Sequence, residues 1–276
     1  MNESDLLSRF RGVRRSGSGL VAFCSAHDDR KRSLSITMRD ARVLLHCFAG
    51  CDFRGILQSA NLTAADLRTE GKAAPARSPE EQITVARRIW ERTRPAPDTV
   101  VERYLRNRCI IESPPRSIRY LPQFEHREYG CPFPCLAAGL QNVTNSFTGV
   151  SITWLAADGT DKAPVGEPAR KVFGVLRASA IRLSEPTDTL VICEGVETGL
   201  SIQQATRLPV WSALSASNLP CVEIPASVNK VIVAADADDA GERAALAAAK
   251  RFLGEGREVR IARPGRRGAD FNDLRV

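Results

Sequence analysis

Short apolar runs that each end in a carboxylate are the feature that most restricts the fold of this sequence. Thr189–Cys193 is followed by Glu194, and Lys230–Ala235 is followed by Asp236 and Asp238. Runs of this length, rich in Val and Ile, are typical of buried parallel strands. We therefore expect a parallel sheet with these acids at the carboxyl ends of its strands, which is where open α/β folds bind ligands.

A third run, Glu258–Ala262, leads to Asp270 and Asp273, and helical spacing of apolar residues over 197–206 and 242–253 follows the first two runs. Three strand ends thus offer carboxylates to one point. Clustered carboxylates repel one another, which raises their pKa values unless a cation lies among them. A ligand set made only of oxygen suits magnesium or manganese, and a pair of such ions about 3.5–4 Å apart suits phosphoryl transfer.

Helix capping is the other interpretation of these acids, because a helix N-terminus favours negative charge. Asp239 and Glu242 fit that interpretation best. Capping alone does not account for Glu194, Asp236 and Asp238 together, since a helix start requires only one acid.

Glu194 followed by Gly, Asp236-x-Asp238 about forty residues later and the acid in Gly-Ala-Asp270 together resemble the Toprim domain of bacterial primases, topoisomerases and some nucleases. The resemblance covers about the last ninety residues. It implies that Glu194 is a general base or metal-bound carboxylate, that Asp236 and Asp238 are metal ligands, and that Asp270, or alternatively Asp273, is the last acid of the cluster.

Two short-spaced pairs of soft ligands lie near the N-terminus, Cys24-x-x-His27 and Cys47-x-x-x-Cys51. Four such ligands predict a closed, tetrahedral and therefore structural zinc site. His46 is an alternative to Cys47 as the third ligand. A small module with little core would depend on the metal, because structural zinc can contribute about 10–16 kcal/mol at neutral pH.

The residues between the two ligand pairs predict a hairpin, with Leu34–Met38 and Arg42–His46 as its arms. This module resembles the Cys-His-Cys-Cys zinc ribbon at the N-terminus of bacterial (DnaG-type) and phage-type DNA primases. Its last pair has three intervening residues where the usual ribbon has two, a spacing similar to the plasmid and phage branch of Toprim proteins. The resemblance implies contact with single-stranded template, for which the basic candidates are Arg30, Lys31, Arg32, Arg11, Arg14 and Arg15.

Ala, Pro, Gly and Ser dominate residues 63–79 and predict a linker. A helix is expected from Ser78-Pro79, and another over Val100–Arg108 that resembles the Tyr-Leu-x-x-Arg-Gly segment of the primase catalytic core, with Cys109 in place of Gly. Strands of a mixed sheet are expected over 117–122, 134–138 and 148–154, followed by a turn at Asp158-Gly159. The resemblance implies that Arg170 and Lys171 contact nucleotide or primer phosphates, and a solvated loop is the alternative.

Four further residues, Cys109, His126, Cys131 and Cys135, raise the question of a second zinc site. Such a site would need three of them in one place. Ordinary thiols are the favoured interpretation, because free Cys is commonly buried in protein cores.

Composition and charge limit the classes of function. The 276 residues are 43% hydrophobic, enough for two or three domains with real cores. Residues 1–130 hold 23 Lys and Arg against 16 Asp and Glu, whereas residues 131–276 hold 16 of each, so the basic surplus lies away from the acid cluster. No secretory signal or membrane segment is evident, which predicts a cytoplasmic protein in which the eight Cys are thiols or metal ligands.

The sequence thus predicts an α/β protein, α+β overall: a zinc ribbon (1–62), a linker (63–79), a central mixed α+β subdomain (80–185) and a C-terminal Toprim domain with a parallel sheet flanked by helices (186–276). The function implied is that of a DNA primase, which uses a single-stranded DNA template, NTPs or dNTPs, structural zinc and catalytic magnesium or manganese. A Toprim nuclease and a catalytically silent zinc-dependent DNA-binding accessory are the alternatives. No Gly-x-x-x-x-Gly-Lys-Ser/Thr motif is present, so a replicative helicase, where one is needed, is expected to be a separate chain.

Overall fold

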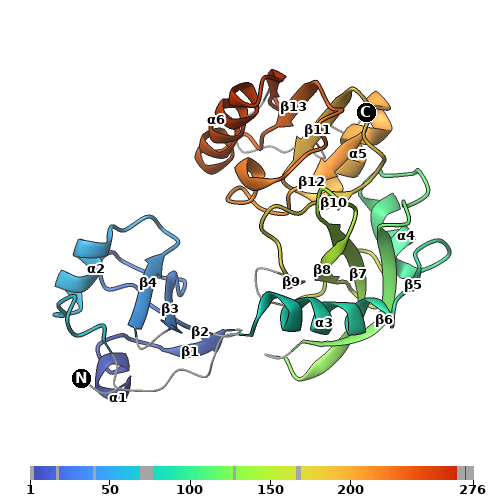
Figure 1. The fold of residues 1–276 in the computed structure, drawn as a ribbon. Coiled ribbons are helices and arrows are strands. Elements are labelled where there is room, and N and C mark those ends of the chain that lie inside the picture. The colour runs from blue at the N-terminus through green and yellow to red at the C-terminus, as the bar shows by residue number, and fades with distance from the viewer. Residues whose placement is uncertain are drawn as a thin grey trace. The chain divides into compact units, whose positions relative to one another are not determined.

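The computed structural model of the chain describes residues 3–16, 19–39, 42–68, 77–126, 129–165, 169–265 and 271. They form two compact units, residues 1–76 and 77–276 (Figure 1). The segment 69–76, within the predicted linker, lies outside the described residues. Among the residues described, no helix is long and apolar enough to cross a membrane.

The N-terminal unit is built around a four-stranded antiparallel sheet in the order β1-β2-β3-β4. Its elements are α1 (Glu3–Leu7), β1 (Arg14–Ser16), β2 (Gly19–Ala22), β3 (Leu34–Arg39), β4 (Arg42–Cys47) and α2 (Phe53–Ser59). The predicted hairpin is confirmed, with Leu34 opposite Cys47 and Met38 opposite Val43. Buried and exposed residues alternate along β4, so Val43, Leu45 and Cys47 face the core.

The second unit begins with α3 (Pro79–Trp90), whose predicted start is confirmed. Ser78 accepts a hydrogen bond from the Glu81 amide and the Glu81 side chain accepts one from the Ser78 amide, which forms a capping box. The helix covers one face of a five-stranded sheet in the order β5-β6-β7-β8-β9. These strands are β5 (Arg94–Pro95), β6 (Ile118–His126), β7 (Cys131–Gln141), β8 (Phe147–Trp154) and β9 (Arg170–Gly174).

Every neighbouring pair in this central sheet is antiparallel, so the expectation of a mixed sheet was wrong. Two of these pairs, β6-β7 and β7-β8, are joined by short turns, and strands joined in this way pair in opposite directions. The predicted turn is present, with Gly159 at φ +72°. A Cβ on that glycine would lie 2.7 Å from the Val100 carbonyl oxygen, so Gly159 allows the turn to pack directly on the start of α4 (Val100–Asn107).

The C-terminal part of the second unit carries the predicted sheet, in the order β10-β12-β11-β13-β14. Its strands are β10 (Ile181–Arg182), β11 (Thr189–Cys193), β12 (Val210–Ser212), β13 (Lys230–Ala234) and β14 (Glu258–Ala262). Only β10 is antiparallel to its neighbour, and the other strands pair in parallel. The helices α5 (Val196–Thr206) and α6 (Asp239–Gly254) follow β11 and β13, and a 3₁₀ turn, η1, spans Leu219–Cys221.

Helices on both faces explain why the strand sequences are continuously apolar. Along β11, Val191 and Cys193 pack in a core with α5, whereas Leu190 and Ile192 pack in a second core with α6. A strand covered on both sides has no solvent face, so it shows no alternation of polar residues. The α5-side core also contains Tyr104 of α4 and residues of β6 and β7, so the central and C-terminal sheets share it.

Candidate active site and metal centre

The candidate acids lie at the carboxyl edge of the parallel sheet. Glu194 directly follows β11, and Asp236 and Asp238 follow β13. In the parallel register Cys193 is opposite Ala234, so the two strands deliver these acids to the same edge. Asp270, the fourth predicted acid, lies outside the described residues, as does Asp273.

Electrostatics show that Asp236 and Asp238 are close enough to influence Glu194. Burial and then the negative charge of Asp236 raise the pKa of Glu194, the charge of Asp238 raises it further, and Arg170 opposes the shift. Like charges held together at a half-buried position are the arrangement that a divalent cation would relieve. The donor set consists of oxygen atoms, so it fits magnesium or manganese.

The turn between β13 and α6 is fixed by a cap and a close backbone approach. Asp238 is the N-cap of α6, and its Oδ1 accepts a hydrogen bond of 2.7 Å from the Gly241 amide. A Cβ on Gly241 would lie 2.5 Å from the Asp236 carbonyl oxygen, so only glycine fits there without a shift. The capping interpretation of Asp239 and Glu242 therefore needs correction: both lie in the first turn, but Asp238 is the cap, and Glu242 pairs with Arg263 at 2.6 Å.

A loop after β12 holds Glu194 from the other side. The Ser212 hydroxyl donates to the Glu194 carbonyl oxygen at 2.7 Å, and the Leu214 amide donates to the same oxygen at 2.8 Å. The Ala216 amide donates to the Glu194 carboxylate. Leu214 is buried and has φ +65°, a strained conformation for a residue with a side chain. This loop could not be predicted from the sequence, because β12 is only three residues long.

The two basic residues predicted to contact phosphates lie on opposite faces of β9. Arg170 lies opposite Thr153, and its Nη2 donates to the Leu214 carbonyl oxygen at 2.8 Å, which places its guanidinium beside the acids. Lys171 lies opposite Ile152, and its ammonium is 5.5 Å from the centre of the Phe173 ring. Because alternate residues of a strand point to opposite faces, only Arg170 faces the acid edge.

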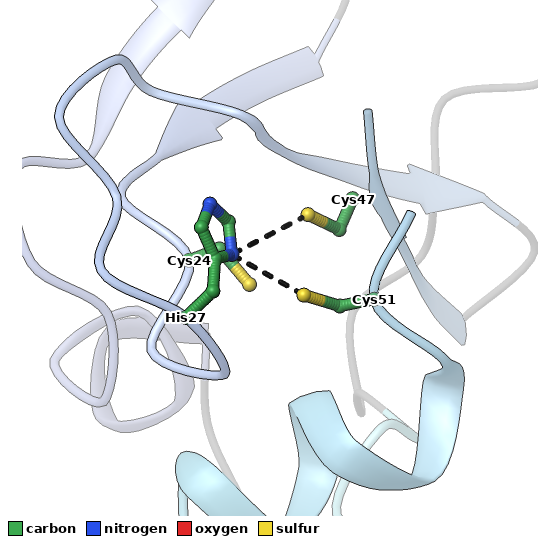
Figure 2. Close-up of side chains that lie close together, drawn as sticks. All are labelled: Cys24, His27, Cys47 and Cys51. Atoms are coloured by element: carbon green, nitrogen blue, oxygen red, sulfur yellow. Dashed lines mark hydrogen bonds between the residues drawn. The ribbon is translucent and has the colours of Figure 1, made fainter. Parts of the chain in front are cut away.

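The four predicted zinc ligands are brought together in the N-terminal unit (Figure 2). Their ligand atoms all lie within 4.8 Å of one another, and His27 Nδ1 is 3.2 Å from Cys51 Sγ and 4.0 Å from Cys47 Sγ. Cys24 and Cys47 are buried. In the part of the chain that the structure describes, this is the one group of His, Cys, Asp and Glu side chains already close enough to share a single ion.

Asp29 organises the backbone around this cluster, and the sequence analysis missed it. Its Oδ2 accepts hydrogen bonds from the Cys24 amide at 2.7 Å and from the amide and hydroxyl of Ser33 at 3.0 and 2.7 Å. Burial alone would raise the pKa of Asp29, but these bonds outweigh it and hold the pKa well below its ordinary range. Ser33 Oγ in turn lies 3.4 Å from Cys47 Sγ. Supporting hydrogen bonds of this kind fix the orientation of metal ligands.

The alternatives at the zinc site are resolved by the strand register. His46 is on the exposed face of β4, where its ring packs at 5.0 Å against Phe48, so Cys47 is the third member of the cluster. Cys135 is buried, and Cys131 and Cys109 are exposed. Among the described residues these thiols and His126 form no second ligand group.

The basic residues beside the cluster differ in their surroundings. Arg30 is exposed and lies 3.6 Å from Asp28, and Lys31 is also exposed. The Arg32 side chain instead donates to the Gly12 carbonyl oxygen at 2.7 Å and lies 4.7 Å from the centre of the Phe23 ring. Arg32 therefore contributes to the packing of the unit, whereas Arg30 and Lys31 face solvent.

Comparison with known families identifies two segments. Residues 189–276 match the Toprim domain, and residues 80–183 match a domain of unknown function, DUF7146. Among curated protein sequences, none is significantly similar to this chain.

Several solved primase structures have a similar architecture. The primase fragment of the bacteriophage T7 primase-helicase protein is 13% identical, with a TM-score of 0.45, and the match covers 92% of this chain and 93% of that one. The Aquifex aeolicus primase (zinc-binding and RNA polymerase domains) is 13% identical, with a TM-score of 0.43 and coverage of 99% and 79%.

A DnaG catalytic core is 17% identical, with a TM-score of 0.39 and coverage of 51% of this chain. The chain spans about half the length of that core, 47%. The acids at the sheet edge agree with the family match, and residues 189–276 are a Toprim domain.

Proposed function

We propose that this protein is a DNA primase that synthesises short oligonucleotide primers on single-stranded DNA by metal-dependent nucleotidyl transfer, in the replication of a plasmid, phage or other mobile element. The observation that carries the proposal is the delivery of Glu194, Asp236 and Asp238 to one sheet edge, with Arg170 of the central sheet beside them. A Toprim domain with these acids supports metal-dependent chemistry on phosphates.

In the proposed reaction, the 3′ hydroxyl of one nucleotide attacks the α-phosphate of the next, a new phosphodiester bond forms, and pyrophosphate leaves. Divalent magnesium or manganese held by Glu194, Asp236 and Asp238, with Asp270 as the predicted fourth acid, would supply charge neutralisation and orientation. Glu194 lies half-buried beside the charges of Asp236 and Asp238, so it is the candidate either to accept the proton of the attacking hydroxyl or to bind metal.

Arg170 is the candidate for binding the phosphates of the incoming nucleotide. One of its N–H groups donates to the Leu214 carbonyl oxygen, and a guanidinium carries five. Lys171 remains a proposed nucleic-acid contact on the opposite face of the strand.

The N-terminal unit is proposed to hold zinc through Cys24, His27, Cys47 and Cys51 and to bind the template. A four-ligand site is closed, so the zinc is structural. Exposed Arg30 and Lys31 would contact phosphates, with Arg32 behind them against Phe23. On the outer face of the sheet, Phe48 is 71% exposed and packs against the His46 ring, and exposed aromatic side chains can stack unpaired bases.

Primer synthesis is the experiment that tests the proposal. With single-stranded DNA, NTPs or dNTPs, and magnesium or manganese, the protein is expected to make short oligonucleotides, and Asp236→Asn is expected to abolish synthesis while template binding is retained. Asp188→Asn is the matched control, because Asp188 is exposed at the opposite end of β11, where it pairs with Lys230.

Two other outcomes would replace this proposal. Shortening of labelled single strands without synthesis would indicate a Toprim nuclease. A protein that neither makes primers nor shortens strands, but still binds DNA, would be a zinc-dependent accessory protein.

A further inference from the structure

The Tyr-Leu-x-x-Arg segment of α4 has no role in the proposed chemistry, yet its first two residues are almost completely buried. Tyr104 and Leu105 are 0% and 1% exposed. Both belong to the core that the central sheet shares with α5 and β11. A tyrosine buried this completely requires a partner for its hydroxyl.

That partner is on the helix that follows Glu194. The Tyr104 hydroxyl donates to Glu197 Oε1 at 2.8 Å. Burial, and then the charge of the Glu197 carboxylate, raise the pKa of Tyr104, so the hydroxyl keeps its proton and remains a donor. Hydrogen bonds to charged groups are stronger than neutral ones, particularly where water is excluded.

Arg108 completes the arrangement on the same face of α4. Its guanidinium carbon lies 5.4 Å from the centre of the Tyr104 ring, and its Nη2 lies 3.3 Å from Asp161 Oδ1. Arg108 is attracted to Glu197 as well as to Asp161. The Glu197 carboxylate is therefore stabilised by a donor and by a cation, both from α4.

The first turn of α5 has no side-chain cap of its own. Its N-cap is Gly195, which has no side chain to cap the first turn. Glu194 immediately precedes this cap, so a shift of the first turn would carry Glu194 with it. The Glu197 contact with Tyr104 lies within that turn.

A second contact fixes the direction of the same helix. Gln204 lies seven residues after Glu197 and therefore on the same face of α5. Its Oε1 accepts a hydrogen bond from the Ile111 amide at 2.8 Å, and its Nε2 donates to the Cys109 carbonyl oxygen at 3.0 Å. Both ends of α5 are thus attached to α4 or to the turn that follows it.

The α4 helix is itself fastened to the central domain. Arg103 donates to the Asp158 carbonyl oxygen at 2.8 Å, and Asn107 donates to the carbonyl oxygens of Gly159 and Thr160 at 3.3 and 3.2 Å. Because α4 is held by these bonds and by its buried face, it can serve as a fixed reference for α5.

We propose that Tyr104 is a positioning residue for Glu194: through Glu197 it fixes the first turn of α5 and so sets the place of the Glu194 carboxylate relative to Asp236 and Asp238. The inference rests on the proposed divalent-metal function of these acids. Tyr104 touches neither metal nor nucleotide in this role, so its effect must reach the site through α5.

The test is Tyr104→Phe in the full chain, with manganese binding measured directly and primer synthesis and thermal unfolding measured alongside. Loss of a supporting partner typically weakens metal affinity or activity about 10–100-fold, so the manganese dissociation constant is expected to rise about tenfold and synthesis to fall at least as much. Tyr129→Phe is the matched control, since Tyr129 is half exposed and packs against His126 away from the acids.

The double variant Tyr104→Phe/Glu197→Gln separates positioning from stability. The neutral amide at position 197 removes the charge that lost its hydrogen-bond donor in Tyr104→Phe, so thermal stability is expected to recover while manganese binding stays weak. Recovery of both would overturn the proposal, as would unchanged manganese affinity in folded Tyr104→Phe. Weakened manganese binding in Tyr104→Phe, when the unaltered protein makes no primers, would support the positioning role and refute the primase.

Discussion

Gly241→Ala is the substitution whose effect the structure predicts most specifically. The added Cβ would lie 2.5 Å from the carbonyl oxygen of Asp236 and 3.1 and 3.2 Å from its amide nitrogen and carbonyl carbon. To reach ordinary van der Waals contact at 3.4 Å, the backbone at Asp236 must retreat by about 0.9 Å. All three atoms are backbone, so no side chain can rotate away to relieve the contact.

The expected effects on stability and on activity differ greatly in size. Overpacking typically costs about 1–3 kcal/mol, whereas replacing Gly by Ala within a helix gains about 1 kcal/mol, so the net loss in the free energy of unfolding is about 0–2 kcal/mol. Misplacing a catalytic group by about 1 Å can cost about 10²-fold in rate. Gly241→Ala is therefore expected to remain folded but to lose about two orders of magnitude in primer synthesis.

Thermal unfolding, manganese binding and primer synthesis measured on one preparation would check this forecast. Gly254→Ala is the matched control, because Gly254 ends the same helix and an added Cβ would meet nothing within 4 Å. If Gly241→Ala binds manganese and makes primers as well as Gly254→Ala does, the close approach of α6 to the Asp236 backbone does not control the site, and the reasoning fails.

Two other predictions concern the remaining parts of the fold. Removal of zinc by a chelator, or Cys51→Ser, is expected to unfold residues 1–76 while residues 77–276 stay folded, because structural zinc contributes about 10–16 kcal/mol. Hydrogen exchange of the backbone amides measures the unfolding of each segment. Persistent protection of the amides of β3 and β4 after zinc removal would contradict the prediction. Cys109 has φ +61° and is exposed, so Cys109→Gly relieves about 1–2 kcal/mol of strain against an entropic loss of about 0.5–1 kcal/mol. Denaturant unfolding is expected to show a gain of about 1 kcal/mol, and a loss would show that the thiol makes a stabilising contact.

The parallel sheet could be predicted because both of its faces are covered. Burial on both faces of β11 and of most of β13 accounts for their uninterrupted Val- and Ile-rich runs, and the zinc ligands are evident from their spacing alone. In contrast, β10 and β12 are two and three residues long, too short to show any periodicity.

The support around each site was not predictable, because it depends on pairs distant in the sequence. Tyr104 and Glu197 are separated by 93 positions, and Arg170 reaches the carbonyl oxygen of Leu214, 44 positions away. Asp29 follows His27 closely, but its buried hydrogen bonds to Cys24 and Ser33 appear only once the loop is folded. The sequence alone also does not show which of Arg170 and Lys171 faces the acids, because that depends on the register of β9.

The core common to the central and C-terminal sheets has a consequence for how such chains can be recombined. The two family matches meet near residue 185, but Tyr104, Leu136 and Leu200 from either side of that point pack in one apolar interior. A Toprim segment transplanted from another protein would meet a surface shaped for a different neighbour. The two segments are therefore expected to be inherited together, with exchange between lineages falling near residue 76 instead.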